Sequence, residues 1–260
     1  MISKNEVRLI QETLLNTWPA KEFFFLNGWI LRFTNGVTSR ANSVLPLIYY
    51  GNKSTIDNDI EIVENAYKLY GLPAIFTMHD YHEPKYLREK LIERGYEEIS
   101  LTTTMGAPIT NLSYLEFNSD YNYEIHNDRT IEFNEFLAKY SKRSIEEQYI
   151  IEEICKRIKI PQKRFVLVKD GNKVIGTTMG VLSINSSLYI ADVLVNPKYR
   201  RKKIASSMLI NLINEWAPYK RYIKIWLQVE IENEIAIKFY DNLGLKRLFN
   251  YYYLQKLVIE

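Results

Sequence analysis

The sequence of 260 residues predicts an α/β (α+β) protein with two domains. Apolar runs with strand composition alternate with amphipathic helical stretches along the whole chain. Asp170, Gly171 and Asn172 separate two of these runs, and this turn chemistry predicts an antiparallel hairpin. Residues 107–120 contain a proline and several Asn and Ser residues without a hydrophobic period, which indicates a boundary between the halves.

The N-terminal domain is expected to cover residues 1–110 as a smaller α+β unit. Ser3 and Glu6 have the spacing of a capping box and precede an amphipathic stripe, which predicts a first helix. Gly71 and Gly95 predict helix ends, because glycine readily takes the left-handed conformation that closes a helix. The other predicted elements are strands over 28–34, 41–50, 74–78 and 99–105, and helices over 57–70 and 84–94.

The C-terminal domain is expected to cover residues 121–260. Ser144 and Glu147 form a second capping box. A helix–glycine–strand unit around Gly95 is similar to one around Gly244, which leaves open whether the first domain is a degenerate copy of the second. The predicted strands are 123–126, 164–169, 173–182, 188–195, 222–229 and 246–255, and the predicted helices are 131–140, 145–158, 203–216 and 233–243.

The composition is that of an ordinary globular protein, with 47% hydrophobic residues, 25% charged residues and a net charge of +3. The single Cys155 excludes an internal disulfide and a multi-cysteine metal site. We expect a cytoplasmic protein without membrane attachment, because the N-terminus lacks the apolar core of a signal peptide and no apolar run spans a bilayer. His79 and His82 have ligand-like spacing, but without further ligands we expect a surface turn and no metal.

A strand over 188–195 enters a helix through a basic turn, and this is the most informative stretch of the chain. The turn from Lys198 to Lys203 contains five Lys and Arg residues. The first amides of a helix have no intrahelical partner, and the helix dipole adds positive charge at the same point. The stretch therefore predicts an anion site, and with Tyr240 on a later helix it indicates a phosphate-bearing cofactor beside a tyrosine. Nucleic-acid binding through the basic turn is a less favoured alternative.

Two motifs in this half of the chain resemble those of the GNAT superfamily of N-acetyltransferases. The run from Arg200 to Ala205 (RRKKIA) is similar to the family's cofactor motif, Gln/Arg-x-x-Gly-x-Gly/Ala. Residues 227–244, which include Asn233 and Tyr240, are similar to its second motif. The match covers roughly residues 121–255. The N-terminal half resembles the extra domain of certain two-domain members.

This resemblance implies a mixed, mostly antiparallel sheet flanked by helices and splayed where a cofactor inserts. It implies an N-acetyltransferase that transfers the acetyl group of acetyl-CoA to an amine by direct attack in a ternary complex. It also implies that the amides of the basic turn hold the pyrophosphate, with pantetheine along the preceding strand. The implied cofactor-binding residues are Val193, Leu194, Val195, Arg200, Arg201, Lys202, Lys203, Ile204, Ala205, Ser206 and Asn233.

Lys203 departs from the family pattern, because the motif has glycine at this position. Glycine lets the backbone approach the pyrophosphate without a Cβ in the way. Lysine can still donate its N–H if its φ is negative, and its ammonium can point at a phosphate. The departure keeps open a second interpretation, a non-catalytic acyl-CoA-binding or regulatory module.

The resemblance implies that Tyr240 is the general acid that protonates the departing thiolate, whereas packing alone is the plain alternative in a chain with 20 tyrosines. Asp192 and Glu230 are the candidate general bases, since they lie on the two strands that would border the substrate. An amide near Leu194 is the implied oxyanion donor. The amine acceptor is left open among small molecules, protein N-termini and lysines, and so is a homodimer.

Overall fold

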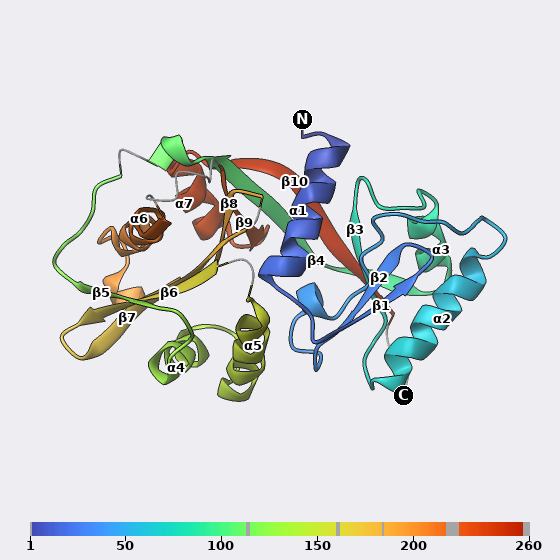
Figure 1. Cartoon of the computed structure of the whole chain (residues 1–260), viewed down its shortest axis with the longest axis horizontal. Helices are drawn as coiled ribbons and strands as arrows, with labels where there is room; N and C mark the ends of the chain where they lie inside the picture. Colours follow the sequence, from blue (N-terminus) through green and yellow to red (C-terminus); the bar gives the residue numbers. More distant parts are fainter. Residues whose placement is uncertain (1, 113–114, 160–161, 184, 217–223, 257–260) are drawn as a thin grey trace. The chain divides into compact units, whose positions relative to one another are not determined.

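The structure is a computed structural model that describes residues 2–112, 115–159, 162–183, 185–216 and 224–256 (Figure 1). The chain divides into two compact units. Among the described helices, none combines the length and the apolar character that crossing a bilayer requires. Three strands contribute residues to both units: β4 (Tyr96–Pro108), β9 (Lys224–Glu230), of which only Glu230 belongs to the first unit, and β10 (Lys246–Lys256). The first unit comprises Met1–Thr104, Glu230–Glu232 and Leu248–Glu260, and the second comprises Met105–Val229 and Asn233–Arg247.

The sheet of the second unit runs in the order β9-β8-β7-β6-β5. Neighbouring strands in this run are antiparallel, except that β8 and β9 are parallel. Gly171 and Asn172 connect β6 to β7, which confirms the predicted hairpin. The sheet is therefore mixed and mostly antiparallel, as expected. Its strands are β5 (Asn122–His126), β6 (Gln162–Asp170), β7 (Lys173–Leu182), β8 (Ser187–Val195) and β9 (Lys224–Glu230).

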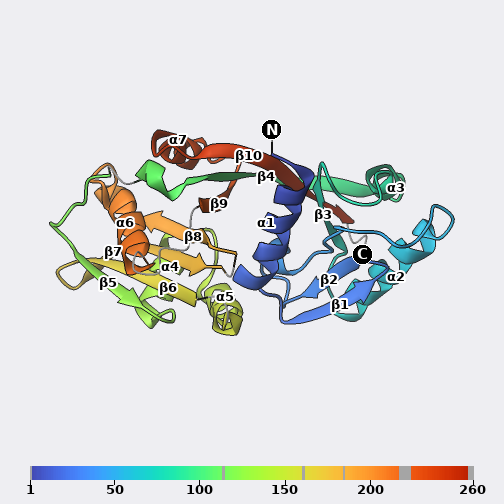
Figure 2. The same cartoon turned by 45° about the horizontal axis from the view of Figure 1, so that its top comes forward.

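Helices cover both faces of this sheet (Figure 2). On one face of β7, Gly176 and Gly180 lie against α6, and a Cβ on Gly180 would be 3.0 Å from the Leu212 side chain. Met179 points to the opposite face, where its sulfur is 3.8 Å from that of Cys155 on α5. Glycine therefore lets α6 approach the sheet closely. The helices of this unit are α4 (Ile131–Tyr140), α5 (Ile145–Arg157), α6 (Ile204–Trp216) and α7 (Glu234–Asn242).

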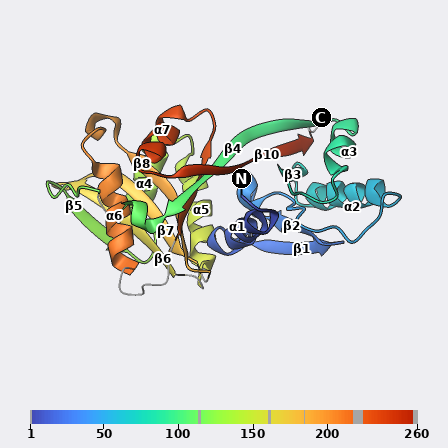
Figure 3. The same ribbon diagram turned by 90° about the horizontal axis from the view of Figure 1, so that it is seen from above.

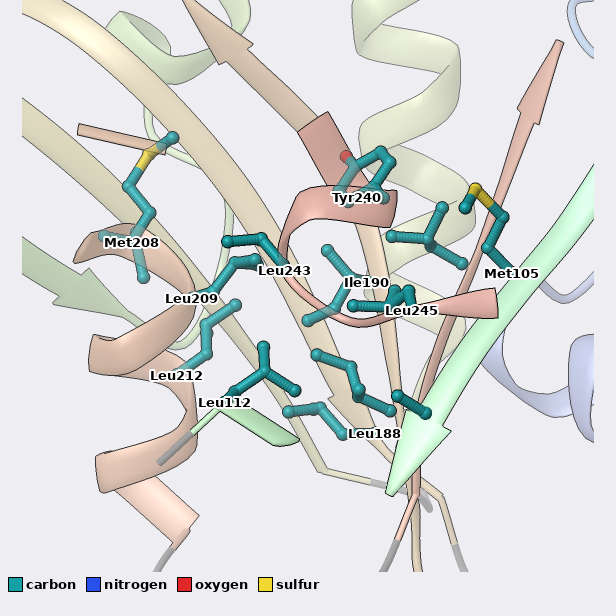
Figure 4. Close-up of a cluster of buried hydrophobic side chains, with 14 of the residues drawn as sticks. Met105, Leu112, Leu188, Ile190, Met208, Leu209, Leu212, Tyr240, Leu243 and Leu245 are labelled. Carbon is teal, nitrogen blue, oxygen red and sulfur yellow. The ribbon is translucent and has the colours of Figure 1, made fainter. Parts of the chain in front are cut away.

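The core of the second unit lies between the sheet and the helices α6 and α7. Leu188 and Ile190 of β8 meet Leu209 and Leu212 of α6 in this cluster (Figure 4). Each of these four side chains is at most 2% exposed, so their burial is a large favourable contribution to folding. The cluster fixes α6 against β8, and the residues that follow β8 and precede α6 are positioned as a result.

The first unit has its own core, which the end of β10 completes (Figure 3). This segment pairs antiparallel with β3, from Tyr251 opposite His79 to Gln255 opposite Ile75. Leu254 of the same segment is fully buried in the core. The C-terminal end of the chain is therefore a structural part of the first unit. Its other elements are α1 (Lys4–Thr17), β1 (Glu22–Leu26), β2 (Trp29–Phe33), α2 (Ile56–Leu69), β3 (Ile75–His79) and α3 (Leu87–Glu93).

The strand predicted over 41–50 was wrong, because this segment forms only isolated bridges at Val44 and Leu45. Local side-chain bonds compete with a strand ladder here. Asn42 Oδ1 accepts the Thr34 amide at 2.6 Å, and its Nδ2 donates to a carbonyl four residues earlier. Asn and Ser side chains commonly offer the backbone such alternatives to regular structure.

His79 and His82 were expected in a surface turn, and that expectation was wrong. They are only 3% and 8% exposed, because the turn is packed into the first unit. His79 Nδ1 accepts the Tyr81 amide at 3.1 Å, while the Nε2 atoms of both histidines are buried without a partner in the described residues. Within the same described residues, no group of three or more His, Cys, Asp or Glu side chains is arranged to hold a metal ion.

Candidate functional site

The strands β8 and β9 separate part of the way along their length. They pair from Ser187 opposite Lys224 to Ile190 opposite Leu227, and no pairing is recorded for the described residues beyond this point. Residues 191–195 are half-buried. The edge of β8 that faces β9 is therefore open over these residues, and its backbone groups can pair with an extended ligand.

A bulge lies at the point where the strands separate. The register between β7 and β8 shifts between Thr177 and Met179, so that two residues of β8, Asp192 and Val193, lie opposite Thr178. Asp192 has a φ of +53°, a left-handed conformation that is uncommon for a residue other than glycine. The Thr177 hydroxyl donates to the Asp192 carbonyl at 3.3 Å and helps to hold the bulge.

The Asp192 side chain pairs with Arg129, a buried arginine that precedes α4. Arg129 also donates to Asn134 Oδ1 at 3.3 Å and to Gln148 Oε1 at 3.1 Å. Burial opposes the charge of Arg129, but the Asp192 carboxylate outweighs this effect and raises the pKa of the guanidinium. The Asp192 carboxylate is therefore paired with the Arg129 guanidinium in the folded protein.

The basic turn between β8 and α6 contains two residues in the left-handed region. Arg201 has a φ of +65°, and Lys203 has a φ of +58°. Lysine could replace the motif glycine without strain only at a negative φ, and the structure does not meet this condition. Lys203 instead takes a conformation that favours glycine, at a cost of roughly 1 kcal/mol. The turn keeps the backbone path that suits glycine, with a lysine side chain attached to it.

The N-terminus of α6 has free amides. The first recorded helical bond is donated by Ser207 to the Lys203 carbonyl, at 3.0 Å. No acceptor for the amides of Ile204, Ala205 or Ser206 is recorded in the described residues, and the first turn contains no acidic residue. These amides, together with the helix dipole, favour an anion at this point.

Side chains from the segment before β5 contact the basic turn, but no contact with those amides is recorded in the described residues. Glu116 forms an ion pair with Lys203 Nζ, and both side chains are well exposed. Asn118 Nδ2 donates to the Lys202 carbonyl at 2.9 Å. Arg200 Nε donates to the Val195 carbonyl at 3.4 Å, so the turn also bonds to the open edge of β8. The ammonium of Lys203 is thus engaged by a carboxylate.

Tyr240 lies on α7 and is 6% exposed. No hydrogen bond of its hydroxyl is recorded among the described residues, and burial raises its pKa. Figure 4 shows the ring at the edge of the core cluster, with the hydroxyl oxygen directed away from the labelled leucine side chains. The side chain is largely buried, whereas its hydroxyl is not among the fully buried polar atoms that lack a partner, so the hydroxyl is accessible to a bound molecule.

The remaining predicted residues lie at the ends of β9 and α7. Asn233 caps α7, with Oδ1 accepting the Ala236 amide at 3.2 Å, and its Nδ2 has no recorded partner in the described residues. Glu230 is exposed at the end of β9, in the short segment that belongs to the first unit. Gln228 was not predicted, yet its buried Oε1 and Nε2 atoms both lack partners among the described residues. Only its alternation along β9 could have indicated it from sequence.

Two family models match the chain. Residues 122–245 match the model described as "Acetyltransferase (GNAT) family", and residues 4–90 match the one described as "Probable histone acetyltransferase Rv0428c C-terminal". The chain is also similar to the uncharacterized N-acetyltransferase YobR of Bacillus subtilis (strain 168). The two are 25% identical over 251 residues, which is 96% of this chain and 98% of that protein.

Solved structures share this fold. A GCN5-related N-acetyltransferase from Kribbella flavida has a TM-score of 0.68 at 11% identity, over 95% of this chain and 94% of that chain. A tandem GNAT protein from the clavulanic acid biosynthesis pathway has a TM-score of 0.64 at 9% identity, over 82% of this chain and 74% of that chain. The model matches in sequence support a two-domain GNAT N-acetyltransferase, and these likenesses show that the chain has the fold of solved GNAT proteins.

Proposed function

We propose that the protein is an N-acetyltransferase that moves the acetyl group of acetyl-CoA to an amine by direct attack in a ternary complex. The observation that carries this proposal is the combination of free amides at the start of α6 with the open edge of β8. The first can hold a pyrophosphate, and the second can hold an extended chain with alternating donors and acceptors. Pantetheine, with its two amides, is such a chain.

The pyrophosphate is bound by the amides of Ile204, Ala205 and Ser206. Charge is added by the basic turn, in which Arg201 has no recorded ion pair in the described residues. The turn residues assigned to the phosphates are Arg200, Arg201, Lys202 and Lys203. Pantetheine pairs with the backbone of Val193, Leu194 and Val195, and the free Nδ2 of Asn233 donates to it from the other side.

In the reaction, the amine nitrogen forms a bond to the acetyl carbon while the carbon–sulfur bond breaks. The electron pair goes to sulfur, and Tyr240 donates a proton to the thiolate. Because burial raises its pKa, Tyr240 stays protonated at neutral pH and is available as an acid. An amide near Leu194, at the bulge, donates to the developing oxyanion.

The attacking amine must lose a proton to a base. Asp192 and Glu230 are the two carboxylates proposed for this role. The Asp192 carboxylate is engaged in the ion pair with the buried Arg129 guanidinium, which it holds as counter-ion. Glu230 is exposed, and no ion pair of its carboxylate is recorded in the described residues, so it is the favoured candidate for the base.

The proposal is tested with two variants of α6. Ala205→Glu places a carboxylate in the first turn, where it stabilises the helix and repels a pyrophosphate. Coenzyme A affinity measured by calorimetry should fall at least about tenfold. Asn211→Glu adds the same charge farther along α6 and should leave the affinity unchanged. If the unchanged protein and both variants bind coenzyme A with equal affinity, the pyrophosphate is not bound at the N-terminus of α6.

Catalysis is tested by the release of free thiol from acetyl-CoA in the presence of primary amines, amino acids and peptides with a free N-terminus or lysine. At least one amine should accelerate release above the rate without amine. If coenzyme A binds but no amine accelerates thiol release, the protein is instead a non-catalytic acyl-CoA-binding module.

A further inference from the structure

Arg32, on β2 of the first unit, is a buried cation without a carboxylate partner. It is 1% exposed. Its Nε donates to the Ser43 carbonyl at 2.8 Å, and its Nη2 donates to Ser43 Oγ at 2.6 Å and to Thr77 Oγ1 at 3.0 Å. All three acceptors are neutral. Among the described residues, neither an ion pair of Arg32 nor an acceptor for its Nη1 is recorded.

Burying a guanidinium in this position is energetically unfavourable. Burial lowers the pKa of Arg32. The guanidinium nevertheless stays protonated at neutral pH, because an arginine pKa starts above 12. A buried charge is tolerated where a counter-ion or a full set of hydrogen bonds compensates it. In the described residues, Arg32 has no recorded counter-ion, and its set of recorded hydrogen bonds is incomplete.

The groups around Arg32 add positive charge and aromatic surface. Arg40 is near enough to oppose the charge of Arg32, and its guanidinium lies over the Trp18 ring at 5.6 Å. Tyr251 and Tyr253, from the end of β10, are at most 5% exposed and interact electrostatically with Arg32. Tyr253 brings no negative charge at neutral pH, because burial raises its pKa above the ordinary value of a phenol.

Two further donors, on α1 and at its C-cap, have no acceptor in the part of the chain that the structure describes. Gln11 is 1% exposed and Trp18 is 3% exposed, yet Gln11 Nε2 and Trp18 Nε1 are both buried without a partner in the described residues. The two residues are seven positions apart, so they lie on the same face of α1. Buried polar groups are almost always hydrogen-bonded. Because the Trp18 ring lies against Arg40, which is near Arg32, the Trp18 donor and the Arg32 cation can share an acceptor that the described residues do not supply.

We propose that the first unit binds a small organic carboxylate between Arg32, Arg40 and the Nε1 donor of Trp18. A carboxylate supplies the missing negative charge and two acceptor oxygens, which match the planar donors of a guanidinium. The aromatic rings of Trp18 and Tyr253 suit the carbon part of an organic acid better than a fully hydrated inorganic anion. The guanidinium charges exclude a metal cation. This site does not depend on acetyl transfer, because all of its groups belong to the first unit.

The test uses the full chain with acetate and succinate as probes, phosphate and sulfate as competing anions, and chloride at equal ionic strength as the reference. Calorimetry and thermal unfolding should show saturable binding of at least one carboxylate. Arg40→Gln, at a half-buried position, should weaken that binding at least about tenfold through the loss of a charge-assisted hydrogen bond. Trp18→Phe, which keeps the aromatic surface and removes the Nε1 donor, should weaken it as well.

Arg88→Gln is the matched control, because Arg88 is an exposed arginine of the same unit. The Arg88→Gln variant should bind the carboxylate with the same affinity as the unchanged protein. The proposal is overturned if neither acetate nor succinate binds saturably, or if Arg40→Gln and Arg88→Gln bind equally well. It is also overturned if phosphate or sulfate binds in an Arg40-dependent way while the carboxylates do not. Near-ultraviolet circular dichroism confirms that each variant is folded.

Discussion

The carboxylate of Asp192 and the guanidinium of Arg129 form an ion pair at the bulge of β8. The Arg129 side chain is fully buried, and that of Asp192 is 17% exposed. The pair joins the open edge of β8 to α4 and α5 through Asn134 and Gln148, which both accept from Arg129. The geometry of the proposed pantetheine edge therefore depends on a charge interaction in the interior of the second unit.

Asp192→Asn should destabilise the protein by about 3 kcal/mol, because it leaves Arg129 buried without a counter-ion. Denaturant unfolding measures this loss. Glu153→Gln removes an exposed partner of Lys156 and should change the stability by less than about 1 kcal/mol. If the two variants are equally stable, Arg129 is compensated by other groups and the role assigned to Asp192 is wrong.

Tyr240→Phe should lower kcat by about a hundredfold, because it removes the proposed proton donor to the thiolate. Its stability should be equal or slightly higher, because the hydroxyl that it removes makes no recorded hydrogen bond in the described residues. Thiol release with the best amine measures the first effect, and thermal unfolding measures the second. An unchanged kcat would show that the leaving thiolate needs no acid at this position.

The pH dependence of the rate gives a separate check on Tyr240. Burial raises its pKa above the ordinary value of 10.0, so Tyr240 keeps its proton over the whole neutral and mildly alkaline range. The rate should rise with pH as the amine loses its proton, without an alkaline decline below pH 10. A decline centred between pH 8 and 9 would exclude Tyr240 as the acid.

Lys203→Gly should stabilise the protein by up to about 1 kcal/mol, because glycine takes a φ of +58° without steric cost. The gain is reduced by the greater freedom of glycine in the unfolded chain. Lys202→Gly is the matched control, since Lys202 is not among the residues with positive φ, and it should be neutral or destabilising. A destabilised Lys203→Gly would mean that the ion pair with Glu116 outweighs the strain.

The buried histidines of the first unit should make the protein unstable in acid. Burial lowers the pKa of His79 to about 3, whereas the unfolded chain has the ordinary value of 6.5. Between these values the unfolded state binds a proton that the folded state does not. The free energy of unfolding should therefore decrease as the pH falls from 6.5 towards 3, by about 1.4 kcal/mol per pH unit for this group.

His79→Asn tests that assignment, because its Oδ1 can replace Nδ1 as acceptor for the Tyr81 amide without binding a proton. Stability measured by urea unfolding between pH 4 and 7 should have a shallower slope than that of the unchanged protein. The same substitution at the partly exposed His126 serves as control and should keep the original slope. Identical slopes for all three proteins would assign the acid sensitivity to other groups.

Much of the fold could be predicted because its signals are local. Ser3 and Ser144 were expected to begin helices, and both form capping boxes in the structure. The hairpin at Gly171 follows from turn chemistry alone. The strand–turn–helix arrangement around Lys203 could be predicted in the same way, because strand composition, a cationic turn and an amphipathic stripe are adjacent in sequence.

Other features depend on residues that are distant in sequence and could not be predicted. Nothing near Arg129 indicates that it pairs with Asp192, because only the packing of α4 on β7 and β8 brings them together. The left-handed conformation of Lys203 is imposed by the path of the turn and contradicts the residue's own preference. The burial of His79 likewise follows from its pairing with Tyr251, a residue from the other end of the chain.

The division of β10 between the units has a consequence for how the protein forms during translation. The first unit lacks its core residue Leu254 and the partner of β3 until the ribosome has made everything from β5 to α7. The N-terminal segment, although synthesised first, must therefore wait with β3 held only by its bridge to Val44, and a strand with an open edge is prone to aggregate. A nascent chain stalled before β10 should thus be a strong client for chaperones that shield exposed strands.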